Sequence, residues 1–145
     1  MAYTQENFEE WIILIPFKMN YFTDIFAGEN NLKLDYSIKS LDELEKWILC
    51  NYKEVNDLIE DRKILDYLTV YIGETFRKYI GGKWVIDLEN KKNVFYSMPV
   101  LTSPEYKGIT CKSPMIYATA SIDRQKGDHI STILSNCIET QEKAR

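Results

Sequence analysis

Glu74 and Arg77 are the side chains of this sequence whose types and spacing best suit acid–base chemistry. They lie three residues apart in a strongly helical segment, so they face one side of a helix and can form an ion pair. If Glu74 faced a pocket, its carboxyl group could act as a general acid or base. We favour the structural alternative, in which the pair is buried and holds Tyr71 or the predicted hairpin that follows the helix.

The single histidine, His129, is the other candidate for catalysis. Asp128 precedes it, and Ser121 or Ser131 could complete a Ser-His-Asp arrangement. Neither serine carries the sequence signature of a nucleophile elbow or an oxyanion hole. We therefore expect that His129 lies on the surface or stabilises a helix cap. We expect no catalytic residues and a protein that is not an enzyme.

The cysteines and the absence of ligand motifs argue against a metal or another cofactor. Cys50, Cys111 and Cys137 are widely spaced, and no CxxC, HExxH or EF-hand pattern occurs. The run Gly81-Gly82-Lys83 lacks the spacing of a phosphate-binding loop and follows a helix rather than a strand. An odd number of cysteines without pair spacing is typical of a reduced chain. We expect no metal and no cofactor.

The first residues predict neither export nor membrane insertion. Glu6, Glu9 and Glu10 stand where a signal peptide would be basic. The apolar run at residues 11–17 is too short to cross a bilayer. Together with the cysteines, this predicts a cytoplasmic protein without membrane contact.

The overall charge is acidic. A net charge of −4 and a pI of about 5.1 argue against a nucleic-acid-binding protein, which normally has a basic face. Lys91 and Lys92 lie near Phe95 and Tyr96 and could bind single-stranded nucleic acid by stacking. That patch is small on an acidic chain, so we expect no nucleic-acid partner.

Acidic residues are concentrated between residues 42 and 61. The favoured interpretation is the solvent-exposed side of two helices, and the alternative is an electrostatic docking surface for a basic protein. The cluster includes Glu45, and the residues that we select as candidate partner contacts are Asp42, Glu43, Glu54, Asp57, Glu60 and Asp61.

The strongest pattern in the chain predicts the helix that must position Glu74. Apolar residues recur every four positions from Ile64 to Ile80, which is typical of a buried helical stripe. Gly81-Gly82 predicts its end. Gly73 lies inside the helix, where a glycine costs about 1 kcal/mol relative to alanine, so another element must approach closely there.

Weaker patterns predict the elements before this helix. Apolar spacing indicates a helix at residues 5–15 that Pro16 disturbs, with a strand as the competing assignment for its isoleucine-rich part. Alternation indicates a short strand at 32–38. Ser40 and Glu43 fit a capping box that opens a helix ending near residue 51. A further helical pattern starts near residue 54 and is either broken near 61–63 or continuous with the central helix.

The elements after the central helix are a hairpin and two helices. Segments 83–88 and 94–98 flank a turn, and Val100-Leu101 could extend the second strand. Ser113-Pro114 predicts the start of a helix to about residue 122, and Asp128 predicts the cap of a last helix with a frayed tail from 139. The predicted fold is a single α+β domain over 1–145, rich in helix, with a small antiparallel β-sheet packed on the central helix.

One set of residues resembles a known pattern. Tyr71-Ile72-Gly73-Glu74 and Gly81-Gly82-Lys83-Trp84, followed by Ile86-Asp87-Leu88 and Pro99, are similar to a pattern in small bacterial cytosolic proteins. Some of these are encoded beside secreted polymorphic toxins and are regarded as immunity proteins. The resemblance covers about residues 40–135 and implies a cytosolic antitoxin that binds and inhibits a cognate toxin protein. It assigns no functional residue.

Two functions remain open at this point. The leading one is a non-enzymatic protein-binding inhibitor of the immunity type, with the acidic cluster as its docking surface. The alternative is a small-molecule-binding or sensor domain, which a deep pocket with convergent polar groups would favour. The candidate pocket residues are Tyr67, Tyr71, Glu74, Arg77, Trp84 and Tyr96.

Overall fold

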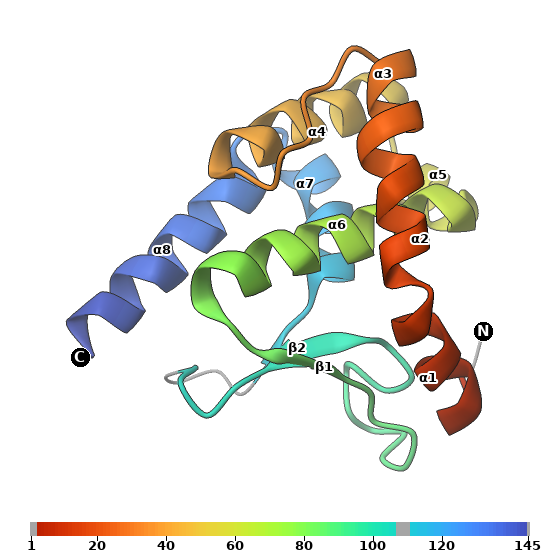
Figure 1. The fold of residues 1–145 in the computed structure, drawn as a ribbon, viewed down its shortest axis with the longest axis vertical. Helices are drawn as coiled ribbons and strands as arrows, with labels where there is room; N and C mark the ends of the chain where they lie inside the picture. The colour runs from red at the N-terminus through yellow and green to blue at the C-terminus, as the bar shows by residue number, and fades with distance from the viewer. Residues whose placement is uncertain (1–2, 107–110, 145) are drawn as a thin grey trace.

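Helices form most of the protein and gather on one side of a small sheet (Figure 1). The computed structural model describes residues 3–106 and 111–144. In Figure 1, α6 lies between the sheet and α4, the run from α1 to α3 stands at one edge, and α8 lies at the opposite edge. The helical elements are α1 (Gln5–Ile13), α2 (Ile15–Asn20), the π-helical stretch η1 (Tyr21–Phe26), α3 (Ala27–Glu29), α4 (Ile38–Asn51), α5 (Val55–Glu60), α6 (Arg62–Ile80), α7 (Pro114–Arg124) and α8 (His129–Lys143). The predicted helix-rich α+β class is confirmed.

The central helix α6 forms as its spacing predicts. Leu68, Ile72 and Phe76 are fully buried, and Gly81, with a φ of 74°, ends the helix. A Cβ atom at Gly73 would overlap the ring of Trp84, which explains why glycine occurs there. A break at Asp61 separates α6 from α5, which decides between the two alternatives left open by the sequence.

The predicted hairpin between residues 83–88 and 94–98 is wrong in its pairing. The sheet has the order β1 (Lys83–Val85), β2 (Val100–Thr102) and β3 (Cys111–Lys112), all antiparallel, with Trp84 opposite Leu101. The carboxylate of Asp87 accepts hydrogen bonds from the Glu89 and Asn90 backbone amides and from the Asn93 side chain. These bonds fold the segment into turns, so the first extended partner for β1 is β2.

The first helical run is longer than predicted. Thr4 and Asn7 form a capping box at the start of α1, and Pro16 lies in the first turn of α2, where proline is tolerated because its missing N–H would have no helical partner. Only Leu14 interrupts the helical pattern, and the run continues through η1 and α3 to Glu29. We call residues 5–29 the N-terminal arm.

The predicted strand at 32–38 and the capping box at Ser40 are also wrong. Tyr36 has a φ of 62°, which is incompatible with a strand, and Ser37 is the residue that caps α4. Ser40 is fully buried inside the helix, where its hydroxyl lies 2.6 Å from the Tyr71 hydroxyl. Leu41, Leu44 and Ile48 are buried as predicted.

The two C-terminal helices begin where the sequence predicts, but the last one ends later. Ser113 caps α7 and Pro114 occupies its first turn. Asp128 precedes α8 without a side-chain cap. The helix continues to Lys143 rather than fraying from Glu139, and the Gln141 side chain donates to the Ile80 carbonyl over 3.0 Å. Among the helices of residues 3–106 and 111–144, none has the length and apolar character needed to cross a membrane.

Candidate functional site

Two members of the acidic cluster hold helices together. Glu45 is fully buried, and its carboxylate accepts from the backbone amides of His129 at 3.0 Å and Ile130 at 2.8 Å. It therefore caps α8 from α4, where the positive end of the helix dipole favours a negative charge. Asp42 accepts a hydrogen bond of 2.5 Å from the Ser131 hydroxyl. These contacts assign a structural role to both carboxylates.

The remaining acidic candidates lie on and around α5. Glu54, Asp57 and Glu60 are exposed, while Glu43 is half-buried on α4. Asp57 accepts from the Glu54 backbone amide over 3.1 Å, which fixes the first turn of α5. Asp61 accepts from the Tyr52 hydroxyl over 2.7 Å, and burial together with this bond raises the pKa of Tyr52. Of the six acidic candidates, only Glu54, Asp57 and Glu60 are thus exposed.

Glu74, Arg77 and Trp84 do come together. The Glu74 carboxylate accepts from the Arg77 guanidinium at 2.8 Å and from the Trp84 indole N–H at 3.1 Å. Arg77 also donates to the Gly82 carbonyl over 3.1 Å. The cluster therefore holds the turn between α6 and β1, as the structural alternative expects, but the pair is not buried: Arg77 is exposed and Glu74 is half-buried.

Tyr67 and Tyr71 lie about one turn apart on α6 and both pack on Phe22, whereas Tyr96 lies elsewhere in the fold. Tyr71 is fully buried, and its hydroxyl contacts Ser40 and accepts from the Tyr36 backbone amide. Burial raises the pKa of Tyr71 to about 12. Tyr67 stacks on Phe22, with ring centroids 5.6 Å apart. Tyr96 lines a separate cavity, so the candidate pocket is not assembled as the sequence suggested.

That separate cavity, of about 730 Å³, lies between the N-terminal arm and α5. Trp11 lines it from α1 and Ile59 from α5, together with Tyr96. Asp66 lies in its wall and accepts from the Trp11 indole and from the Lys18 ammonium, both at 2.7 Å. The N-terminal arm and the acidic helix α5 therefore line the same cavity.

His129 is not paired with either serine. Ser121 is buried and donates to the Ala118 carbonyl, and Ser131 donates to Asp42. Within the described ranges no hydrogen bond joins the His129 ring to a serine hydroxyl, and no group of three His, Cys, Asp or Glu side chains is placed to hold a metal ion. Cys50 and Cys137 are free thiols.

The sequence interpretation missed an exposed apolar surface on the arm. Ile13 is 67% exposed and Phe17 is 69% exposed, and Tyr21 and Ile25 are also exposed. These four residues recur every four positions and therefore lie on one side of the run, away from the buried side with Phe22. We call Ile13, Phe17, Tyr21 and Ile25 the apolar ridge. Its spacing is visible in the sequence once the helix is continued past Pro16.

Acidic residues lie at both ends of the N-terminal arm. The arm carries five acidic residues and one basic residue. The basic residue, Lys18, is already paired with Asp66. The acidic residues are exposed and are Glu6, Glu9, Glu10, Asp24 and Glu29. The apolar ridge thus lies between two acidic ends of the arm, and no acidic residue of the arm stands between Glu10 and Asp24.

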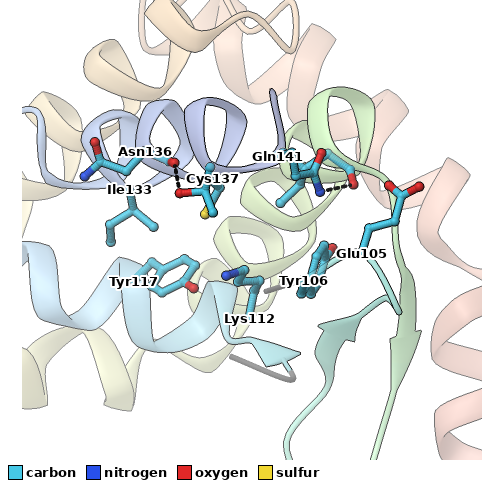
Figure 2. A pocket seen from close by; sticks show the side chains of 10 residues that line it. Glu105, Tyr106, Lys112, Tyr117, Ile133, Asn136, Cys137 and Gln141 are labelled. Carbon is cyan, nitrogen blue, oxygen red and sulfur yellow. Dashed lines mark hydrogen bonds between the residues drawn. The ribbon is translucent and has the colours of Figure 1, made fainter. Parts of the chain in front are cut away.

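A second cavity lies under α8 (Figure 2). It measures about 270 Å³ and is closed by β3, the loop after β2, the start of α7 and the second half of α8. Lys112, Tyr106 and Tyr117 form one wall, and Ile133 and Cys137 face them from α8. None of these residues belongs to the pocket predicted from the sequence.

Comparison with known proteins finds no relative: no protein-family model matches the chain, and neither curated proteins nor solved structures give a significant match. Function is therefore inferred from the surfaces and cavities of the described residues.

Proposed function

We propose that this protein is a non-enzymatic inhibitor of the immunity type, which binds a cognate secreted toxin in the cytoplasm of the producing cell. The observation that supports it is the apolar ridge. Large apolar side chains scattered singly on a surface need no explanation, but several gathered on one helical side are typical of a protein interaction site.

The ridge has the features of a binding hot spot. Phe17 and Tyr21 are aromatic, and aromatic residues dominate the energetics of protein interfaces. Tyr21 is held in place by the ring of Tyr67, with centroids 5.5 Å apart, so little side-chain entropy is lost on binding. Tyr21 and Ile25 lie in η1. Turns of π-helix are rare in proteins overall, and those that occur are frequently found at functional sites.

The charge around the ridge identifies the kind of partner. A second copy of the chain would bring the acidic rims of two arms together, which like-charge repulsion disfavours. A membrane surface is disfavoured too, because interfacial helices carry basic residues that attract anionic lipid. A protein with an apolar groove and a basic rim fits both the ridge and its border. A nuclease toxin with a basic cleft has that chemistry.

Helix α5 provides a further group of exposed acids, across a cavity from the arm that Arg62 also lines. Glu54, Asp57 and Glu60 are exposed, and the cavity lined by Ile59 and Trp11 links α5 to the arm. Exposed charges act mainly on the association rate. Replacing Glu54 and Glu60 together by lysine, with the capping Asp57 kept, therefore slows complex formation and weakens protection, while the fold stays intact.

The test uses the secreted toxin domain encoded beside the gene, co-expressed with the protein in a bacterial host. Wild-type protein restores growth and forms a stoichiometric complex on size-exclusion chromatography. Phe17→Glu places a charge at the centre of the ridge and lowers the affinity about 30-fold or more, the effect of losing a hot spot of about 2 kcal/mol.

Tyr79→Glu is the matched control. Tyr79 is 37% exposed, as Tyr21 is, but lies at the far end of α6. It retains full protection and affinity. A toxin that kills in the presence of the wild-type protein, or a neighbourhood without a secreted toxin, overturns the function. Full protection by Phe17→Glu would be compatible with the inhibitor function but would exclude the apolar ridge as the binding surface.

A further inference from the structure

The position of Lys112 indicates a ligand-binding site more clearly than that of any other side chain described. This lysine is only 8% exposed and lines the 270 Å³ cavity under α8. Within residues 3–106 and 111–144, no carboxylate lies within ion-pair distance of its ammonium group. Its one described electrostatic contact is with the ring of Tyr106, whose centroid lies 5.1 Å away.

Most of the Lys112 side chain is covered, while its ammonium group still reaches solvent, since no polar side-chain atom of the described residues is both fully buried and without a hydrogen-bond partner. Partial burial weakens its hydration, and its described contact is with an aromatic ring rather than with an anion, so the group can bind an anionic partner. The position is also rigid: Lys112 pairs with the buried Leu101 in the sheet, and Ser113, which caps α7, follows it directly. The lysine is thus held in the cavity wall by two elements rather than carried there by a flexible loop.

The groups around Lys112 define the rest of the site. Figure 2 shows Tyr117, Lys112 and Tyr106 side by side along one wall, opposite Ile133 and Cys137 of α8. Burial raises the pKa of the Tyr117 hydroxyl, so that it stays protonated and can donate a hydrogen bond at neutral pH. The hydroxyl of Tyr106 is already engaged, because it donates to the Gly81 carbonyl over 2.7 Å.

We propose that this cavity binds a small organic carboxylate with an apolar or aromatic body. The carboxylate would complete a charge-assisted bond with Lys112 and accept from Tyr117, and the body would lie against Ile80 and Ile133. One ammonium group in an apolar cavity suits a monoanion better than a phosphate dianion. The volume is slightly below the roughly 300–1,000 Å³ of drug-sized pockets, which favours a ligand the size of a single ring.

Glu105, which is exposed, also lines this cavity. Its charge opposes an anionic ligand, so its removal strengthens binding if the ligand is a carboxylate. Substitutions of Lys112 and Glu105 must therefore change the affinity for a carboxylate in opposite directions.

The experiment titrates the full chain with benzoate and with its neutral analogue benzamide, followed by amide chemical shifts in NMR spectra. Benzoate binds saturably, shifts the signals of Tyr106, Tyr117 and Cys137, and binds about tenfold more tightly than benzamide. Lys112→Met, which keeps an unbranched apolar side chain, removes this preference. Glu105→Gln increases it.

Lys126→Met is the control, since it removes an exposed lysine from the loop between α7 and α8. It leaves benzoate binding unchanged. Equal binding of benzoate and benzamide, no saturable binding of either, or unchanged binding by Lys112→Met would overturn the proposal. No toxin takes part in this titration, so its result is independent of the inhibitor function.

Discussion

At the scale of single residues, Tyr71 links two helices through its hydroxyl, which lies 2.6 Å from Ser40 on α4 and accepts from the Tyr36 backbone amide. Burial raises the pKa of Tyr71 to about 12, above the value of about 10 that it has when unfolded. Stability from the neutral hydroxyl is therefore complete below about pH 10 and is lost as the pH rises toward 12, because the unfolded chain releases its proton first.

Tyr71→Phe tests this linkage. It lowers the free energy of unfolding at pH 7 by about 1–2 kcal/mol through the lost hydrogen bonds. It also makes the decline in stability between pH 10 and 12 shallower by up to about 1.4 kcal/mol per pH unit. Urea unfolding at several pH values measures both effects. If the free energy of unfolding fell with pH in parallel for the wild type and Tyr71→Phe, the raised pKa of Tyr71 would not be the cause of the decline.

Gly73 carries the second prediction at this scale. Gly73→Ala drives a methyl group into the Trp84 ring and lowers the melting temperature by the equivalent of about 1–3 kcal/mol. Trp84→Phe in the same chain recovers part of that loss, since the smaller ring leaves room for the methyl group. Gly28→Ala is the control: it is also helical, nothing lies within 4 Å of its Cβ position, and it is neutral or stabilising. Equal effects of the two alanine substitutions would exclude the close approach.

At the scale of elements, the cap supplied by Glu45 fastens α8 to α4. Glu45→Ala leaves two α8 amides without an acceptor and lowers the free energy of unfolding by about 2–3 kcal/mol. Glu43→Ala, on the same helix and half-buried, changes it by less than about 0.5 kcal/mol. Chemical denaturation of the two variants measures the difference. Similar small losses for both would show that the cap contributes little.

The elements that the sequence predicts well are those with a long repeat. Helix α6 has a stripe from Ile64 to Ile80 and a glycine stop, and both signals are local. The strand that pairs with β1 is not a local property, because segments 94–98 and 100–102 both have apolar residues. The bonds to Asp87 and the burial of Leu101 decide between them, and a sequence pattern reports neither.

At the scale of the whole molecule, the candidate site was the least predictable feature. Asp42 and Glu45 looked like surface charges, but their partners lie 84 to 89 residues further along the chain. The apolar ridge was hidden by the assumption that Pro16 ends the first helix. The residues of the ridge and their spacing can be read from the sequence. Their exposure to solvent cannot, because it depends on which side of the arm the rest of the fold covers.

The apolar ridge is the surface that we propose to bind a basic toxin. Tyr21 and Tyr79 offer the most direct measurement, because each is a tyrosine with 37% exposure and the two belong to different surfaces. Tyr67, which contacts Tyr21, lies about 18 Å from Tyr79 along the α6 axis. Isothermal titration of the neighbouring toxin domain into each alanine variant compares them. We predict at least about tenfold weaker binding for Tyr21→Ala and wild-type affinity for Tyr79→Ala. Wild-type affinity for Tyr21→Ala, or an equal loss in both variants, would contradict the claim.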